Sequence, residues 1–596
     1  MSNAVSVRIN DARHLRFALY DVLDAEALTA LPHFSAHSRD TFDAALDLAE
    51  KIALEKFAPH SRKSDLNEPA FVDGKVKLIP EIEDALLAYN QAGFTAASID
   101  AERGGMQLPF MVTTACDTLF AAANASTVAY PSLARGVANL LLGYGTPAQI
   151  ERYAQPIIEG RYFGTMCLSE PQAGSSLADI RCRAEVQPDG SYRLSGAKMW
   201  ISAGDHELGE NIVHLVLAKI VGAPAGVRGI SLFIVPRFCV NADGTRGARN
   251  DVQLAGLNHK MGQRGSVNTF LKFGESGECY AELVGEPHQG LGYMFHMMNE
   301  ERIGVGVGAI AQGIAGYLYS LDYARERRQG RHPDQKDPNS PPVTLIEHAD
   351  VRRMLLAQRA YAEGSHVLAL YAARLVDEGF DESRREVSRL LLELLTPIVK
   401  AWSSDYTLRA NEMAIQVLGG YGYTRDYPVE QYYRDNRINP IHEGTNGIQA
   451  IDLLGRKVMM QNGAALRALI DVVNADIDRA RMLEPLRELA DRLAVARDQI
   501  LGATLRAGQR MAAGEVRGVL ANATFYLNAL GHLCIGWIWL RQARVALSAA
   551  TLDADFVAGK VATCRFFFAT ELPHIAHWCN IVDSDDSSLA MREEWF

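Results

Sequence analysis

The segment INPIHEGTNGIQ, residues 438–449, places one carboxylate, Glu443, among apolar neighbours and beside a glycine. Burial among Ile438, Pro440 and Ile441 would disfavour the charged carboxylate and raise its pKa, as a general base near neutral pH requires. Gly444 leaves the backbone open to close approach by a ligand. The segment therefore predicts a catalytic base. The alternative is an ordinary helix start with Glu443 in its first turn, where acidic residues are common.

Residues 166–204 predict a loop of small residues followed by a β-hairpin. Apolar and charged residues alternate between Arg181 and Val186, and Pro188-Asp189-Gly190 supplies a turn before the alternation resumes. The small residues between Ser169 and Ser175 could bring backbone and hydroxyl groups close to a planar polar ligand. By itself, such a loop is more often only a turn.

A glycine-rich turn and a helical stretch, QVLGGYGYTRDYPVEQYYRDNRI at residues 416–438, lead directly into the Glu443 segment. Together with residues 166–204, this order resembles the acyl-CoA dehydrogenase family, flavoproteins that desaturate acyl thioesters beside the carbonyl group. The resemblance covers residues 80–460 approximately. It implies that Glu443, in the EGT triplet, is the catalytic base.

The resemblance also implies FAD as the cofactor and assigns its contacts. The positions matching contacts to the isoalloxazine ring are Met166, Leu168, Ser169, Trp200 and Ser202. Those matching contacts to the FAD of a neighbouring subunit are Arg327, Gln329, Gln416, Gly419 and Gly420. Thr445 and Gln449, which follow the base, also match positions that contact the cofactor. The substrate side is matched by Ser175, Arg302 and Gly444.

This chain departs from the family pattern at several of these positions. Ser169 and Ser202 stand where threonines are usual and keep the hydroxyl, so no required hydrogen-bond donor is lost. Met166 replaces a frequently aromatic residue, and the usual aromatic residue before Gly330 is missing. FAD binding is still expected, whereas the fine geometry around Gln329 is open.

The reaction explains why these groups occur together. A proton beside a thioester carbonyl is weakly acidic, so its removal needs a base, donors to the developing enolate oxygen, and an acceptor for the hydride. No side chain accepts a hydride, but an oxidised flavin does. By resemblance, the backbone N–H of Glu443 and a ribityl hydroxyl of FAD hold the thioester oxygen, with the substrate between base and flavin.

Gly304, Gly306 and Ala309 imitate the GxGxxA fingerprint of dinucleotide-binding folds. The preceding residues GYMFHMMNEERI do not form a strand pattern, and small residues continue at helical spacing, so we expect a helix packed closely on another. Glu301 on this helix is the alternative base, because isovaleryl- and long-chain-type members carry theirs one residue before the arginine matched by Arg302. Otherwise Glu301 is a solvated or salt-bridged helix residue.

Composition agrees with a soluble enzyme of several domains. The 596 residues are 48% hydrophobic and 22% charged, and the net charge of −11 argues against a dominant nucleic-acid or anionic-membrane role. Eight cysteines without CxxC spacing imply neither a disulfide scaffold nor a metal site, which fits a reducing cytoplasm. We expect no secretion signal at the N-terminus and a buried helix at residues 525–540, which are too few for a membrane span.

The pattern along the chain predicts an α+β fold that is mostly α. We expect an N-terminal helical domain at 1–160, a central β-barrel-like domain at 161–280, a four-helix bundle carrying the base at 281–460, and an additional C-terminal helical domain at 465–596. A polar, proline-rich loop interrupts the bundle at 328–345. Together with the segments DARHLRFALYDVLDA at 11–25 and PAFVDGKVKLIP at 69–80, this C-terminal extension resembles a bacterial subgroup of the family, the methylthiopropanoyl-CoA dehydrogenase-like proteins.

The resemblance implies two kinds of protein partner and leaves alternatives open. FAD that bridges subunits requires a homo-oligomer, so a homodimer at least is expected, with a tetramer as the lesser alternative, and electron-transfer flavoprotein is the expected acceptor. An acyl-CoA oxidase, which passes electrons to oxygen, is the nearer rival. A DNA-binding flavoprotein with a basic C-terminal domain is the distant one, but residues 465–596 carry 14 Lys and Arg against 16 Asp and Glu.

Overall fold

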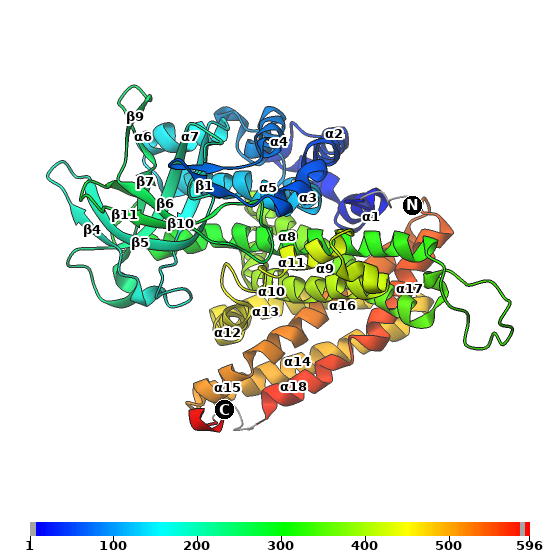
Figure 1. The fold of residues 1–596 in the computed structure, drawn as a ribbon. Helices are drawn as coiled ribbons and strands as arrows, with labels where there is room; N and C mark the ends of the chain where they lie inside the picture. The colour runs from blue at the N-terminus through cyan, green and yellow to red at the C-terminus, as the bar shows by residue number, and fades with distance from the viewer. Residues whose placement is uncertain (1–7, 585–590) are drawn as a thin grey trace. The chain divides into compact units, whose positions relative to one another are not determined.

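The computed structural model describes residues 8–584 and 591–596, and the side chains of residues 295–299 lie outside that description. The chain forms two compact units, which we call the helical unit and the barrel unit (Figure 1). The helical unit comprises Met1–Arg39, Phe110–Thr118 and Arg302–Phe596, and the barrel unit comprises Asp40–Pro109 and Leu119–Glu301. Two long helices, α5 and α8, contribute to both units.

The barrel unit begins with helices and a small hairpin. The helices are α2 (Arg39–Ile52), α3 (Ala58–Leu66), α4 (Pro80–Gln91), α5 (Phe110–Tyr144), α6 (Pro147–Gln149) and α7 (Gln155–Ile158), and the hairpin is β1 (Ala70–Val72) with β2 (Lys75–Lys77). Backbone angles at Asn124 are not helical, which marks a kink within α5. Apolar side chains of α4, α5 and α7 pack in one core with strands β3, β6 and β7, introduced next.

The remaining strands form one large sheet and a short separate hairpin. They are β3 (Tyr162–Cys167), β4 (Arg183–Val186), β5 (Tyr192–Ser202), β6 (Asn211–Ile220), β7 (Ile230–Pro236), β8 (Phe238–Val240), β9 (Arg246–Arg249), β10 (Val252–Leu257), β11 (Asn268–Phe273) and β12 (Tyr280–Leu283). The pairing β4-β5-β12-β7-β6 returns to β4, so five strands close into a ring around an apolar interior. The predicted hairpin and the β-barrel-like middle are confirmed.

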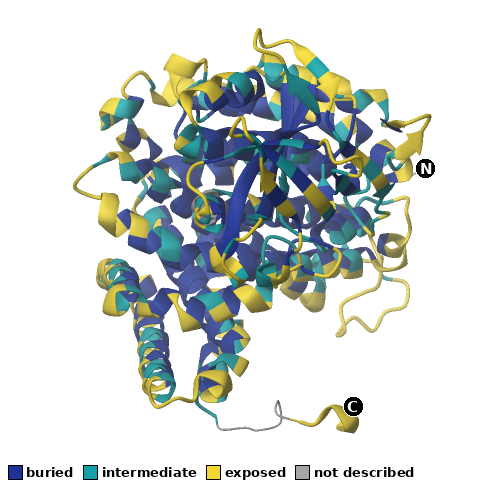
Figure 2. Ribbon diagram, turned by 90° about the vertical axis from the view of Figure 1, so that its left-hand side faces the viewer, coloured by how far each residue is buried: buried dark blue, intermediate teal, exposed yellow. Residues whose placement is uncertain are grey.

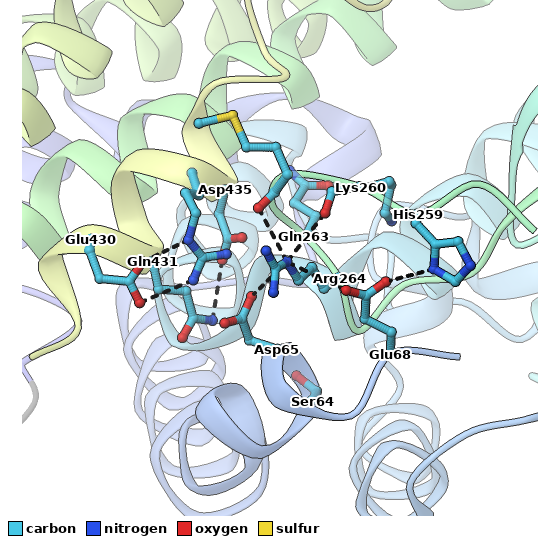
Figure 3. A network of polar contacts seen from close by, with 12 residues as sticks. Ser64, Asp65, Glu68, His259, Lys260, Gln263, Arg264, Glu430, Gln431 and Asp435 are labelled. Carbon is cyan, nitrogen blue, oxygen red and sulfur yellow. Dashed lines mark hydrogen bonds and ion pairs between the residues drawn. The ribbon is translucent and has the colours of Figure 1, made fainter. Parts of the chain in front are cut away.

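A polar network fixes α3 to the connection between β10 and β11 (Figure 3). The Arg264 side chain reaches Glu68 at 3.6 Å and the buried carboxylate of Asp65 at 3.9 Å. Glu68 also lies 3.1 Å from His259. These contacts tie two segments of the barrel unit that are distant in sequence.

The helical unit contains the remaining helices. After α1 (Ala12–Arg16) they are α8 (Gly290–Glu326), α9 (Ala349–Asp377), α10 (Arg385–Leu418), α11 (Val429–Asn436), α12 (Asn446–Gly455), α13 (Met460–Arg481), α14 (Arg487–Ala512), α15 (Val516–Ala521), α16 (Ala523–Ser548), α17 (Ala554–Thr570) and α18 (His574–Asp583). Most carry both buried and exposed segments, as expected for helices packed on one side (Figure 2). The predicted proline-rich loop separates α8 from α9, and it is largely exposed.

The small residues of α8 serve close helix packing, which confirms the rejection of a dinucleotide fingerprint. A Cβ atom added at Gly306 would lie 2.6 Å from the carbonyl oxygen of Val399 on α10. A Cβ at Gly313 would lie 2.8 Å from Thr407, also on α10. Glycine is therefore needed for the backbones to approach this closely.

The C-terminal helices form an array around α16, whose residues from Ala529 to Leu540 are all buried. The neighbouring α14 and α18 run side by side at the C-terminal end of the chain (Figure 1). Two helical segments, Glu300–Glu326 of α8 and all of α16, have the length and hydropathy of a membrane span, but 83% of each apolar window is buried. Both segments are therefore core helices of the fold.

The fold is mostly helical, and its large sheet lies in the middle of the sequence, as expected. The small hairpin of β1 and β2 is an exception, because it lies within residues 1–160, which were expected to be helical. The two units each combine segments that are distant in sequence. The four predicted domain ranges therefore stay a prediction about how the chain is organised.

Candidate active site

Glu443 lies on a tight turn between α11 and α12, before the first residue of α12. Thr445 caps that helix, because its hydroxyl accepts a hydrogen bond from the N–H of Ile448 at 3.4 Å. The backbone is left-handed at both Glu443, with φ +51°, and Gly444, with φ +84°. The alternative of an ordinary first-turn glutamate is therefore wrong. A left-handed non-glycine residue costs about 1–3 kcal/mol and is common at functional sites.

Both carbonyl oxygens of this turn are held by side chains. The carbonyl of Glu443 accepts a hydrogen bond from Nε2 of Gln449 at 3.2 Å. The carbonyl of Gly444 accepts one from Nζ of Lys400 at 2.8 Å. A Cβ atom at position 444 would lie 2.6 Å from Nε2 of Gln449, so a larger residue would displace that side chain and would also have to adopt a left-handed backbone at φ +84°.

The charges around Glu443 act in opposite directions on its pKa. Its side chain keeps partial contact with solvent, yet the protein atoms around it disfavour the carboxylate and raise its pKa. The positive charges of Arg302 and Lys400 oppose that rise. Burial also lowers the pKa of His442 to about 3, so this neighbour is neutral near pH 7. The result is a carboxylate suited to accept a proton near neutral pH.

A second group of predicted residues comes together at the end of α10 and the end of α8. They line a cavity of about 420 Å³ in the helical unit, which includes Arg327, Gln329, Gly419 and Gly420. The Arg327 guanidinium lies 5.7 Å from the centre of the Tyr421 ring.

The backbone of this cavity is open. Gly419 has φ +63°, and a Cβ atom at Gly419 or Gly420 would meet no atom within 4 Å. Gln416, one turn earlier on α10, is exposed. An uncovered glycine backbone beside a guanidinium group suits the pyrophosphate of a dinucleotide, so these residues fit the adenosine end of FAD.

A third group of predicted residues lies where β3 ends beside β5 in the barrel unit. The carbonyl of Ser169 accepts a hydrogen bond from the N–H of Met199 at 3.0 Å, which sets Leu168 and Ser169 beside Trp200. The hydroxyl of Ser202 accepts one from Nδ2 of Asn268 at 3.1 Å.

Two further residues complete this third group. Met166 is the fifth residue of β3 and is partly buried, and Ser175 is exposed on the loop that follows. Trp200 has φ +66°, and 63% of its surface is exposed. A large aromatic side chain held out of the core beside hydroxyl groups fits a contact to a planar ring such as isoalloxazine.

A buried ion pair supports this loop. Nζ of Lys198 donates to the carbonyl of Leu168 and to Oε1 of Glu170, both at 2.9 Å. Glu170 also accepts hydrogen bonds from the N–H groups of Arg181 and Cys182, at 2.6 and 3.0 Å. The Lys198 charge and these hydrogen bonds outweigh burial and lower the pKa of Glu170 to about 2.

Sequence reasoning missed both lysines, Lys400 and Lys198. Lys400 had a visible signal, because a single lysine stands inside the apolar run LTPIVKAW of a long helix. Lys198 had none beyond its place in a strand that alternates irregularly. Across the described ranges 8–584 and 591–596, no cluster of three or more His, Cys, Asp or Glu side chains is arranged to hold a metal ion.

Three family models match the chain in succession. "Acyl-CoA dehydrogenase, N-terminal domain" matches residues 40–161, and "Acyl-CoA dehydrogenase, C-terminal domain" matches residues 288–459. "Acetyl-CoA dehydrogenase C-terminal like" matches residues 468–592. The third match covers the segment that the sequence predicts as an additional C-terminal domain.

Curated relatives align along nearly the whole chain. The 3-methylmercaptopropionyl-CoA dehydrogenase of Ruegeria pomeroyi is 36% identical over 97% of this chain and 98% of its own length. A broad-specificity linear acyl-CoA dehydrogenase of Mycobacterium tuberculosis is 34% identical over 98% of this chain and 99% of its own length.

Solved structures show the same fold. The Caenorhabditis elegans protein ACDH-11, solved in complex with C11-CoA, matches with a TM-score of 0.78 at 18% identity, over 100% of this chain and 98% of its own. An acyl-CoA dehydrogenase of Bacillus anthracis, solved with FAD, matches with a TM-score of 0.73 at 20% identity, over 92% of this chain and 88% of its own. The chain therefore belongs to the acyl-CoA dehydrogenase family of FAD-dependent oxidoreductases.

Proposed function

We propose that this protein oxidises acyl-CoA thioesters to trans-2-enoyl-CoA, with Glu443 as the catalytic base. The observation that carries the proposal is the turn at Glu443 and Gly444. The backbone of Glu443 is left-handed there, and side chains hold both carbonyl oxygens of the turn. The turn thus presents a carboxylate of raised pKa. Such a carboxylate is pre-organised to take a proton from carbon.

The residues of this chain have distinct tasks in that reaction. A carboxylate oxygen of Glu443 accepts the proton from the α-carbon of the thioester. Burial raises the pKa of Glu443, and the positive charges of Arg302 and Lys400 oppose that rise and so favour its ionised form. Bound FAD supplies the acceptor for the hydride that leaves the β-carbon.

The two groups of predicted cofactor residues hold opposite ends of FAD in this proposal. Met166, Leu168, Ser169, Trp200 and Ser202 of the barrel unit hold the isoalloxazine ring. Arg327, Gln329, Gln416, Gly419 and Gly420 of the helical unit hold the pyrophosphate and adenosine of the FAD bound by the neighbouring subunit. Thr445 and Gln449 add cofactor contacts after the base, and Ser175, Arg302 and Gly444 face the substrate. Glu301, beside Arg302 on α8, is the alternative base.

Linear acyl chains are the proposed substrates. The relatives that align over 94% or more of this chain, at 31–36% identity, are named for 3-methylmercaptopropionyl, broad-specificity linear and butyryl substrates. Relatives named for branched substrates align over 67–71% of it, at 24–28% identity. We propose electron-transfer flavoprotein as the acceptor, a homodimer as the assembly and the cytoplasm as the location.

A reoxidation experiment tests the reaction and separates it from an oxidase. The purified yellow protein is mixed anaerobically with CoA thioesters from four to about eighteen carbons, with 3-methylmercaptopropionyl-CoA and with isobutyryl-CoA, and the loss of visible flavin absorption is recorded. Each reduced sample is then given either air or electron-transfer flavoprotein. We expect linear thioesters to bleach the flavin and the flavoprotein to restore it faster than air. Faster restoration by air identifies an oxidase, and no bleaching by any thioester contradicts the proposal.

A further inference from the structure

We infer that Lys400 is a positioning residue, which locks the turn carrying Glu443 and helps to keep that carboxylate ionised. The inference rests on the proposed role of Glu443 as the base. Lys400 lies on α10, far from Glu443 in the sequence, and its side chain is fully buried. A buried lysine costs folding free energy unless its ammonium is well paired, so its presence calls for an explanation.

The contacts of Lys400 converge on the residues that follow Glu443. Nζ donates to the carbonyl of Gly444 at 2.8 Å and to Oδ1 of Asn446 at 2.9 Å. Nδ2 of Asn446 donates back to the carbonyl of Ala401 and the hydroxyl of Ser404, both at 3.1 Å. Gly444 and Asn446, the first residue of α12, are thus both held to α10 by these hydrogen bonds.

These bonds bear directly on the conformation of the base. The carbonyl of Gly444 is the second acceptor of a turn in which Glu443 is left-handed, and Gln449 holds the first. Without a donor from Lys400, that carbonyl and the amide of Asn446 lose their charged partner. The turn can then relax toward ordinary backbone angles, which would move the Glu443 carboxylate.

The charge of Lys400 acts on Glu443 as well. The positive groups facing Glu443 are Arg302 on α8 and Lys400 on α10, and both lower its pKa. Lys400 itself has a pKa lowered to about 8 by burial, with Asp405 and Glu443 opposing and Arg302 adding to that effect.

The other titratable groups here are accounted for by their own partners. Asp405 has a raised pKa because it is buried, although a hydrogen bond from Asn446 opposes the rise. His442 is held neutral. Asp452 on α12 and Arg456, which follows that helix, act on Arg302. Removing the Lys400 charge therefore leaves burial less opposed at Glu443, and the pKa of Glu443 rises.

Three variants separate donor from charge. Lys400→Met removes both, Lys400→Gln keeps a donor without charge, and Lys400→Arg keeps the charge with a bulkier head group. The rate of anaerobic flavin reduction by butyryl-CoA is measured across pH in the FAD-loaded protein, together with thermal unfolding at each pH. For Lys400→Met we expect a rate of flavin reduction on the order of 10- to 100-fold lower. We also expect the rising limb of its pH–rate profile, which follows deprotonation of Glu443, to be displaced to higher pH. The pH–rate profile of Lys400→Gln should be displaced in the same direction. Lys400→Arg should reduce its flavin more slowly than wild type, but its pH–rate profile should not be displaced.

Lys560→Met is the matched control, because Lys560 is another fully buried lysine of the helical unit. Its partners, His14 and Glu363, both at 2.7 Å, are not part of the Glu443 turn. Lys560→Met should unfold at a lower temperature than wild type, but the rising limb of its pH–rate profile should not be displaced. Where Lys400→Met fails to fold, Lys400→Gln decides the question.

The inference is overturned if the Lys400 variants keep the wild-type limb, or if Lys400→Arg shifts it as far as Lys400→Gln does. Failure of the proposed function looks different: either no thioester reduces the flavin of the wild-type protein, or the thioester reduces the flavin of Glu443→Gln at the wild-type rate at every pH.

Discussion

At the scale of single residues, Glu443 combines features that oppose stability. Its backbone is left-handed, and its carboxylate is partly removed from water. Both features suit a proton acceptor, and both raise the free energy of the folded state. The hydrogen bonds from Lys400 and Gln449 offset part of this cost.

Glu443→Gln should therefore make the folded protein more stable at neutral pH. A raised carboxyl pKa means that folding favours the protonated form, so Glu443 contributes most stability at acid pH. That contribution is lost as the pH rises from the ordinary glutamate range through the raised pKa. Urea unfolding of both FAD-loaded proteins across pH measures the difference between them. Curves that stay equal from acid to neutral pH would contradict the raised pKa.

The sequence predicted Glu443 and Gly444 from local composition, because the burial of a carboxylate among apolar neighbours is visible in a short segment. Lys400 stands out as a single lysine in an apolar helical run, but its role could not be predicted in the same way. Its partner is a backbone carbonyl on a segment distant in sequence, and a carbonyl leaves no mark in the sequence. The left-handed backbone of Glu443 could not be predicted either, because Gly444 indicates a turn but does not show that the preceding residue is also left-handed.

At the scale of elements, periodicity predicted the strands and helices well. The alternation around Pro188-Asp189-Gly190 became β4 and β5, and strands β6 and β11 lie within the β region predicted at 161–280. Closure of the ring could not be derived from the pattern, since it requires β4 to pair with the distant strand β6 as well as with β5. Pairing between distant strands depends on packing of the whole unit.

The contact between α8 and α10 gives a prediction at this scale. Gly306→Ala should lower the free energy of unfolding by about 1–3 kcal/mol, because its Cβ would meet the Val399 carbonyl at 2.6 Å. Gly308→Ala, two residues further on, is the control, since its Cβ meets nothing within 4 Å. It should be neutral or stabilising by up to about 1 kcal/mol. Equal urea midpoints for the two variants would remove the close-packing role of Gly306.

At the scale of the whole molecule, the chain's division into units follows contacts rather than sequence order. Phe110–Thr118 belongs to the helical unit although the rest of α5 belongs to the barrel unit. No local pattern marks such a boundary within a helix, and for this reason the sequence predicted domains as continuous ranges. The predicted site residues are likewise divided between the units, with Glu443 in one and Trp200 in the other.

The assembly gives a prediction at this scale. The side chain of Arg327 lies beside an open glycine backbone, so Arg327→Ala should weaken FAD retention, dimerisation or both. Arg325→Ala is the control, because Arg325 is also exposed but pairs with Asp322 on the same helix at 3.5 Å. Gel filtration with detection of bound flavin measures both properties. Wild-type mass and flavin content in Arg327→Ala would remove the proposed role between subunits.

The most direct test of Glu443 as the base is anaerobic mixing of FAD-loaded Glu443→Gln with butyryl-CoA. Glutamine has nearly the same size but cannot accept the α-proton near pH 7, and a general base contributes about 10²- to 10⁴-fold to the rate. We predict that the variant stays yellow and reduces its flavin slower than wild type by at least that lower factor. Bleaching at the wild-type rate would contradict the account and leave Glu301 as the candidate base.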